Sequence, residues 1–424
     1  MYKLPLLKTF TALALALAAC FAAVSSAAVA SPRVTEYKLP AEFALPNDLT
    51  TGPDGAVWVT DSSLGRIWRI PAKGRIRSYE LGQMPGAIVT AHGSMWVADS
   101  GGDAIHRVEA NGSSTRYPLE TGAFPIDITA GPDGALWFTE GRGDAIGRLA
   151  LDGTIDRYPL PTTGAFAGDI TTGPDGALYF SEAGTNKVGR ITTAGVITEF
   201  AVPGENALPG PIVAGPDGAL YVAERNDNVI SRMTTSGEFT DEFALPRENA
   251  NPVAMIAGPD GALWISEHST GVVSRMTFDG TFTKKYRIPG GSTETLIAGA
   301  DGALWIGQSN NIGAVSRLDI GFDPPVTAEG TEFATRAGKS ATHTLATFSD
   351  ADPNARPGDY CVTINWGDGS RSDGTVRRAA DGSFEVRGRH TYHRRGVYKV
   401  VVRITDGVGK GLDAKVESSA NVSR

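Results

Sequence analysis

The stretch Gly131-Pro132-Asp133-Gly134-Ala135-Leu136-Trp137-Phe138-Thr139-Glu140 recurs along this chain of 424 residues. Four recognisable copies and two degraded ones share its order, at residues 173–182, 215–224, 258–267, 299–308, 52–61 and 93–99. The aromatic residues of the seven copies are spaced 38 to 43 residues apart, at Trp58, Trp96, Trp137, Tyr179, Tyr221, Trp264 and Trp305. A fixed period of about 40 residues with strand-like composition is typical of a β-propeller, in which each repeat forms one four-stranded blade.

Each repeat predicts four short strands. In the third repeat the four segments are 126–130, 135–139, 145–149 and 154–160. The Gly-Pro-Asp-Gly sequence between the first two predicts a tight turn, because glycine adopts positive φ without a steric penalty. The fourth segment alternates in polarity, which is typical of a half-exposed outer strand.

The two ends of the repeat array complement each other. The seventh repeat stops after its third segment, 314–319, and no outer strand follows. The segment Val34–Pro40 matches the outer segments of other repeats and precedes the first blade with no partner of its own. We therefore predict an all-β fold in which residues 31–322 form a seven-bladed propeller closed by this N-terminal strand, which removes the exposed sheet edges.

Residues 1–30 predict an export signal. Two lysines precede an apolar run over 13–24, and Ala28-Val29-Ala30 forms a signal-peptidase site. The alternative is a lipobox ending at Cys20, which would carry a lipid. Both alternatives predict a secreted or cell-surface protein.

The amino-acid composition limits the kinds of bonds and binding partners that this protein is expected to have. Cys361 is the one cysteine after the signal, so no internal disulfide is expected in the mature chain. No later stretch reaches 18 apolar residues, so no transmembrane span is expected. The formal net charge of −8 argues against nucleic acid as a partner and leaves cationic ligands, Mg²⁺ or Ca²⁺ open.

After Gly321 the repeat ends and the composition becomes basic and β-branched. Residues 323–424 contain Asn365-Trp366-Gly367-Asp368-Gly369-Ser370 and later His390-Thr391-Tyr392. Alternation over 397–404 predicts a strand with one buried face. These motifs resemble the PKD domain, which implies an immunoglobulin-like β-sandwich that serves exported proteins as a spacer or adhesive unit.

The repeat also carries a family resemblance. Its core is followed by Ile146-Gly147-Arg148 and then by Tyr158-Pro159-Leu160-Pro161. Over residues 34–320 the chain resembles the virginiamycin B (streptogramin B) lyase family. The resemblance implies a seven-bladed propeller that inactivates a cyclic depsipeptide antibiotic, by Mg²⁺-dependent elimination across the ester rather than by hydrolysis.

The chain departs from this family at the positions that carry its chemistry. A histidine of the family falls on Val253, and a Glu-Pro-His motif falls on Ser292-Thr293-Glu294. A later glutamate falls on Ser309 and a tyrosine on Asn47. A general base needs a group that accepts a proton, which valine lacks. The lyase residues are therefore not retained at these positions.

Three residues after each aromatic residue comes an acid or amide, at Asp61, Asp99, Glu140, Glu182, Glu224, Glu267 and Gln308. One interpretation is a carboxylate-lined mouth that holds Ca²⁺ or Mg²⁺. The favoured interpretation is structural pairing with arginines that recur in the third strands, at Arg69, Arg107, Arg148, Arg190, Arg232, Arg275 and Arg317.

A second polar set lies on the innermost strands. Asp48, Asp127 and Asp169 occupy equivalent positions in blades one, three and four. With Asn47, they are candidate ligand-binding residues of an off-centre site, and the alternative is that they are solvated strand starts.

His268 is the candidate catalytic base. It follows Glu267 in the loop after the second strand of blade six, and Glu294 lies in the neighbouring blade. Glu267, His268 and Glu294 are candidate catalytic residues, and the two glutamates are candidate metal ligands. The alternative is a solvated loop histidine. Motifs of Ser–His–Asp hydrolases and nucleotide-binding loops are absent from the sequence.

Three hypotheses about function follow. The first is a non-catalytic, monomeric propeller that binds a small molecule, a glycan or a cell-envelope protein on its funnel face. The second is a carbon–oxygen lyase of the family type with a relocated base, and the third is a structural envelope protein.

Overall fold

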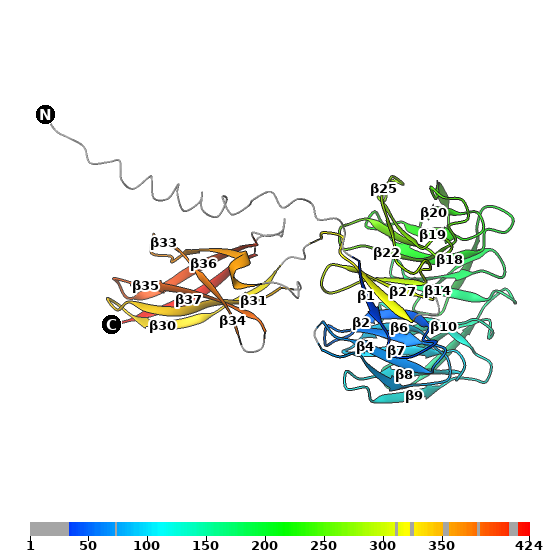
Figure 1. The fold of residues 1–424 in the computed structure, drawn as a ribbon, viewed down its shortest axis with the longest axis horizontal. Coiled ribbons are helices and arrows are strands. Elements are labelled where there is room, and N and C mark those ends of the chain that lie inside the picture. Colours follow the sequence, from blue (N-terminus) through cyan, green and yellow to red (C-terminus); the bar gives the residue numbers. More distant parts are fainter. Residues whose placement is uncertain are drawn as a thin grey trace. The chain divides into compact units, whose positions relative to one another are not determined.

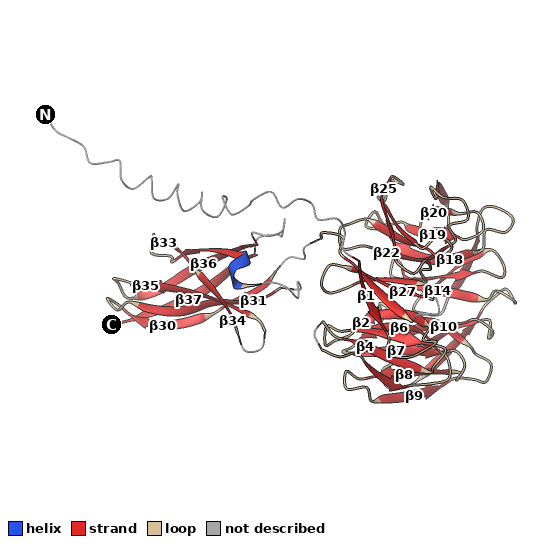
Figure 2. Cartoon of the chain, in the orientation of Figure 1, coloured by secondary structure: helices blue, strands red, loops and turns tan. Residues whose placement is uncertain are grey.

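The computed structural model describes residues 34–72, 74–309, 313–322, 326–350, 356–379, 382–406 and 414–424. The predicted export signal and Cys20 lie outside these residues. One compact unit ends at Ile320 and a second begins at Gly321. Strands form nearly all the regular structure of both units (Figure 2). No helix among the described residues is long and apolar enough to cross a membrane.

The first unit consists of seven four-stranded antiparallel sheets, the blades, whose strands follow one another from the innermost to the outermost. Blades one to three comprise β2 (Pro46–Thr51), β3 (Val57–Asp61), β4 (Arg66–Ile70) and β5 (Arg77–Glu80); β6 (Pro85–Ala91), β7 (Ser94–Asp99), β8 (Ala104–Val108) and β9 (Ser114–Pro118); and β10 (Pro125–Ala130), β11 (Leu136–Glu140), β12 (Ala145–Leu149) and β13 (Ile155–Pro159). Blades four to six comprise β14 (Ala167–Thr172), β15 (Leu178–Glu182), β16 (Lys187–Ile191) and β17 (Ile197–Ala201); β18 (Pro209–Ala214), β19 (Leu220–Glu224), β20 (Val229–Met233) and β21 (Phe239–Ala244); and β22 (Pro252–Ala257), β23 (Leu263–Glu267), β24 (Val272–Met276) and β25 (Phe282–Arg287).

Blade seven closes the ring as the sequence predicts. It combines β26 (Thr295–Ala298), β27 (Leu304–Gln308) and β28 (Ala314–Leu318) with β1 (Val34–Lys38), which runs antiparallel to β28. Figure 1 shows blue β1 beside the yellow strands of this blade. The innermost strands contact one another in turn, and β26 contacts β2. The prediction of seven blades closed by the N-terminal strand is confirmed.

The repeated sequence motif forms a set of contacts in the outer half of six of the seven blades, which we call the outer lattice. In blade three, the buried Trp137 donates its Nε1–H to Asp133 Oδ1 at 3.0 Å. Arg148 Nε donates to Asp133 Oδ2 at 2.7 Å, and the Trp137 ring stacks on Tyr158 at 5.6 Å between centroids. A Cβ at Gly131 would lie 2.3 Å from the indole, so the repeat requires glycine there. Six blades repeat the aspartate–aromatic–arginine set, with aspartates 54, 133, 175, 217, 260 and 301.

The predicted pairing of the third-strand arginines with the recurring acids was wrong. Arg148 lies opposite Trp137 in the β11–β12 register, so its guanidinium reaches Asp133 in the turn. Glu140 lies three residues further along the strand, about 10 Å away at the usual rise, and pairs instead with Arg157 of the outer strand at 2.7 Å. The turn aspartate, which sequence reasoning treated only as a turn residue, is the partner.

The second unit is a two-sheet β-sandwich, as predicted. One sheet has the order β29 (Thr327–Gly330), β31 (Ala341–Ser349), β35 (Phe384–His390), β34 (Thr375–Arg378), and the other has the order β30 (Glu332–Arg336), β37 (Ala414–Ser423), β36 (Gly396–Asp406), β32 (Tyr360–Asn365), β33 (Arg371–Asp373). A short 3₁₀ helix, η1 (Pro357–Asp359), precedes β32. Apolar residues of both sheets share one core. Two residues of the sequence motifs belong to it: Trp366 is fully buried, and Tyr392 Oη donates to its carbonyl oxygen at 3.0 Å.

Candidate functional site at the mouth of the propeller channel

Three aspartates of the innermost strands link neighbouring blades. Asp48 Oδ2 accepts the backbone N–H of Ile88 on blade two at 2.9 Å. Asp127 Oδ2 accepts that of Ile170 on blade four at 2.7 Å, and Asp169 Oδ2 accepts that of Ile212 on blade five at 2.8 Å. Thr295 Oγ1 of blade seven also donates to Asp48 Oδ1 at 2.7 Å. The predicted ligand-binding aspartates therefore have structural partners already, while each keeps part of its surface accessible.

The three carboxylates influence one another because they lie on innermost strands, which contact one another around the ring. Burial raises the pKa of Asp169 to about 6, against hydrogen bonding from Ile212 and the charge of Arg225. Burial, followed by the charge of Asp169, raises the pKa of Asp127 well above its ordinary value. Burial likewise raises the pKa of Asp48. Enclosure disfavours the charged form, and each additional carboxylate adds repulsion.

A cluster of polar side chains from blades five, six and seven forms what we call the mouth cluster: Arg225, His268 and Glu294. Arg225 and His268 each directly follow the recurring acid of their blade, so they occupy equivalent positions, and Glu294 directly precedes β26. His268 Nδ1 lies 2.9 Å from Glu294 Oε1, with 36% and 29% of the two side chains exposed. The predicted neighbourhood of His268 and Glu294 is thus present.

Arg225 interacts electrostatically both with Glu294 of this pair and with Asp169 of the innermost strands. Its side chain crosses Gly210, where a Cβ would lie 2.7 Å from Nε, so a larger residue at 210 would displace the guanidinium. Enclosure by the funnel wall lowers the pKa of Arg225, and the charges of Asp169 and Glu294 act in the opposite direction. The guanidinium therefore lies in the field of both carboxylates. Sequence reasoning missed Arg225, although comparing the residue after each recurring acid would have singled it out together with His268.

Glu267 is not part of the cluster. Its side chain is fully buried. The carboxylate accepts one hydrogen bond from Thr270 Oγ1 at 2.9 Å and another from Ser274 Oγ. Asn47, by contrast, is exposed at the start of β2. The roles proposed for these two residues in ligand or metal binding stay predictions.

The recurring acids do not line a mouth, which corrects the alternative interpretation of a carboxylate ring. All seven residues, including Gln308, are at most 2% exposed. They hold the ends of their own blades: Asp61, for example, accepts the backbone N–H groups of Leu45 and Leu64 and the indole N–H of Trp68. Burial raises the pKa of both Glu182 and Glu224 to about 7. The strands that carry them are buried along their whole length, so these side chains are enclosed on either face of the sheet.

The positions at which the family resemblance implies Mg²⁺ chemistry carry unsuitable donors here. Ser292 Oγ and Ser309 Oγ lie 3.0 Å apart, where the resemblance places two glutamates. Neutral hydroxyls do not replace carboxylates as ligands for a hard divalent cation. The remaining carboxylate, Glu294, faces an imidazole and lies in the field of Arg225. Among the described residues no group of three or more His, Cys, Asp and Glu side chains converges on a metal position, and these donors do not fit Mg²⁺.

The fold and the site define a seven-bladed propeller with a carboxylate-lined channel and a charged mouth. Residues 32–318 match the profile of the virginiamycin B lyase family, and the chain belongs to this family.

Solved structures agree with this assignment. A streptogramin B lyase is 32% identical over 68% of this chain and 97% of its own, with a TM-score of 0.63. The virginiamycin B lyase from Staphylococcus aureus is 32% identical over 68% of this chain and 100% of its own, with a TM-score of 0.64. A catalytically inactive variant of that enzyme with quinupristin is 33% identical over the same shares, with a TM-score of 0.63. A search of the curated proteins found no match.

Proposed function

We propose that this protein is a secreted or cell-surface ligand-binding propeller, in which the lyase chemistry of the family has been replaced by recognition at the channel mouth. The observation that carries the proposal is the exchange of side chains at one place. Where the family resemblance places a histidine and two glutamates, this chain has Val253, Ser292 and Ser309, while Arg225 and the His268–Glu294 pair occupy the same mouth.

The chemistry of the cluster favours a small polar molecule or a glycan. Arg225 and a protonated His268 donate hydrogen bonds to oxygen acceptors, and Glu294 accepts from hydroxyl or ammonium groups. The surrounding acidic channel disfavours a nucleic acid. The C-terminal sandwich, whose sequence resembles a PKD domain, would then act as a spacer or adhesive module.

A binding screen with matched variants tests this role. The full mature chain is applied to a glycan array and a metabolite library, with retained compounds confirmed by calorimetry. We expect a retained ligand to lose at least about tenfold in affinity with Arg225→Ala and with His268→Ala, since each removes a charge-assisted hydrogen bond. Arg287→Ala is the control, because Arg287 is an exposed arginine on the outer strand of blade six. Equal losses in all three variants, or no retained compound, would contradict the proposal and favour a structural role.

The His268–Glu294 pair also supports a second candidate, elimination by a relocated base. Glu294 Oε1 lies 2.9 Å from His268 Nδ1, and an imidazole beside a carboxylate can accept a proton at its other ring nitrogen, as a general base does. Mass spectrometry of quinupristin incubated with the protein, with and without Mg²⁺, separates the two functions. Binding alone leaves the substrate intact, whereas a ring-opened product of unchanged mass would establish elimination and contradict our first proposal. An active family lyase serves as the positive control.

A further inference from the structure

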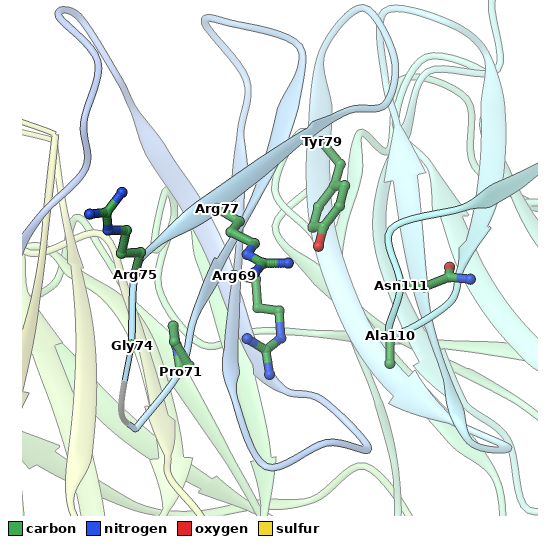
Figure 3. Close-up of a pocket in the computed structure, with 8 residues that line it drawn as sticks. All are labelled: Arg69, Pro71, Gly74, Arg75, Arg77, Tyr79, Ala110 and Asn111. Atoms are coloured by element: carbon green, nitrogen blue, oxygen red, sulfur yellow. The ribbon is translucent and has the colours of Figure 1, made fainter.

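The outer edge of blade one carries a basic hollow that is separate from the mouth. It has a volume of about 420 Å³ and is lined by three arginines, Arg69, Arg75 and Arg77, together with Tyr79 and Asn111. Figure 3 shows the arginine side chains on blade one and Asn111 on the neighbouring turn of blade two. β5 is the outermost strand of its sheet, so these side chains lie at the rim of the propeller and away from its channel.

The repeat itself shows that these arginines are exceptional. Arg75 and Arg77 lie one and three residues after the turn glycine that precedes the outer strand. The same two positions in blades two to six are neutral or acidic, occupied by Ser113 and Thr115, Thr154 and Asp156, Val196 and Thr198, Glu238 and Thr240, and Thr281 and Thr283. Since the other blades place neutral or acidic residues at these positions, packing of the blade does not require arginine here.

The charges of the hollow are not balanced within the blade. Arg69 pairs with Asp54 at 2.5 Å, as its counterparts do in the outer lattice. Among the described residues, Arg75 and Arg77 have no ion-pair partner, and Arg77 lies directly opposite Arg69 in the β4–β5 register. In blade three the residue opposite the lattice arginine is Asp156, which forms a 3.1 Å ion pair with Arg148. Like charges placed directly opposite one another are destabilising.

Tyr79, which lines the hollow, is closely packed on both sides. Tyr79 stacks on the buried Trp58 at 5.7 Å between ring centroids. Its ring also lies beneath Gly112 of blade two, where an added Cβ would be 2.0 Å from the ring. This packing fixes the turn that carries Asn111 against blade one. The arginines therefore border a preformed surface, which lowers the entropic cost of ligand binding.

We propose that this hollow binds the anionic groups of an acidic polysaccharide, with carboxylates or sulfates held by Arg75 and Arg77. Guanidinium groups bind planar oxyanions through paired charge-assisted hydrogen bonds. A polysaccharide with one charge on each sugar unit, and so a lower charge density than duplex DNA, fits one small basic hollow on a chain of net charge −8. A nucleic acid, with a charge about every 1.7 Å of duplex, would need a longer basic surface and would be repelled by the rest of the propeller. This inference goes beyond the mouth site and does not depend on it.

The test uses the full mature chain and fluorescein-labelled polygalacturonate, followed by fluorescence anisotropy at low salt. The double variant Arg75→Ser with Arg77→Thr copies the residues of blade two. We expect it to bind at least about tenfold more weakly, because charge-assisted hydrogen bonds are lost, and to melt no lower than the unaltered protein, because a repulsive pair is removed. The double variant Lys284→Ser with Lys285→Thr removes the same charge from the outer strand of blade six and is expected to bind as the unaltered protein does.

Further arms separate the sources of binding. Inorganic sulfate at millimolar concentration should compete, and labelled neutral dextran should not bind. Binding of dextran equal to that of polygalacturonate, or equal weakening by the two double variants, would overturn the proposal. Tighter binding of a single-stranded oligonucleotide than of polygalacturonate would overturn the assignment to a polysaccharide.

Discussion

The outer half of the blades and the wall of the channel come from the same seven repeats, but only the outer half is uniform. An aspartate, an aromatic residue and an arginine form the same contacts in six blades, as Asp133, Trp137 and Arg148 do in blade three. The equivalent channel position changes from blade to blade, from Asp48 to Ala87, Asp127, Asp169, Pro211, Ala254 and Thr295. The repeated residues are thus kept in the outer half, where the blades pack in the same way, and they vary on the innermost strands, where the blades converge.

Symmetry explains the difference. A residue of the outer lattice contacts its own blade and its neighbour, so identical copies do not interfere. Residues on the innermost strands face a common axis, where seven identical carboxylates would repel one another. Three are present, and the charge of Asp169 already contributes to the raised pKa of Asp127. Residues that depart from the repeat, such as Arg225, Arg75 and Arg77, are therefore the candidates for functions that the other blades do not share.

The largest effect is expected in the outer lattice. Trp264→Ala removes a fully buried indole that stacks on Tyr286 and donates to Asp260 at 2.9 Å. We expect the free energy of unfolding to fall by about 3 to 5 kcal/mol, because a large cavity remains. Urea denaturation measures the loss. Phe43→Ala is the control, since Phe43 is 71% exposed, and a similar loss in both variants would contradict the assigned role of the lattice.

A smaller effect of opposite sign is expected in the channel. The pKa of Asp169 is raised to about 6 in the folded protein, whereas an unfolded aspartate titrates at about 4. The folded state therefore binds more protons between these values, and this group lowers stability as the pH rises from about 4 to 6. Asp169→Asn keeps an oxygen acceptor for the Ile212 N–H and removes the charge. We expect it to be more stable than the unaltered protein at pH 8 by about 1 to 3 kcal/mol, a gain that disappears near pH 4.

Asp175→Asn is the matched control for this pH series. Burial acts to raise the pKa of Asp175, but hydrogen bonds from Arg190 and the Ala177 N–H outweigh it and leave the pKa lowered. The stability it contributes is present above its unfolded pKa and is lost as the pH falls through the folded pKa. The variant should therefore be destabilised at pH 8. Melting temperatures across pH 3 to 8 distinguish the two, and parallel profiles would show that channel and lattice carboxylates do not differ as described.

The smallest effect on stability is expected at the mouth. His268→Ala removes an imidazole that is 36% exposed and faces one carboxylate. Exposed ion pairs contribute less than about 1 kcal/mol, so urea denaturation should show a change within that limit while ligand binding changes. A loss comparable to that of the lattice variant would show that the cluster serves the fold, and would remove the support for a binding site.

Sequence reasoning predicted the fold well because the repeat makes local interactions seven times. The spacing of the aromatic residues predicted the blades, and the unpaired segment at Val34–Lys38 predicted ring closure with β28, which the register confirms. It was wrong about the arginine partners, because the pairing depends on which end of a strand the side chain reaches. Arg148 lies opposite Trp137, and in this register its guanidinium pairs with Asp133 and not with Glu140.

The sequence by itself determined the seven blades, the closing strand and the sandwich, because each follows from a local pattern. Only the tertiary structure decided which of the residues that depart from the repeat lie next to one another. Closure of the ring places Thr295 against Asp48, 247 residues apart in the chain. The same curvature brings His268 of blade six to Glu294 of blade seven. Contacts between blades depend on the angle between whole sheets, which no single repeat encodes.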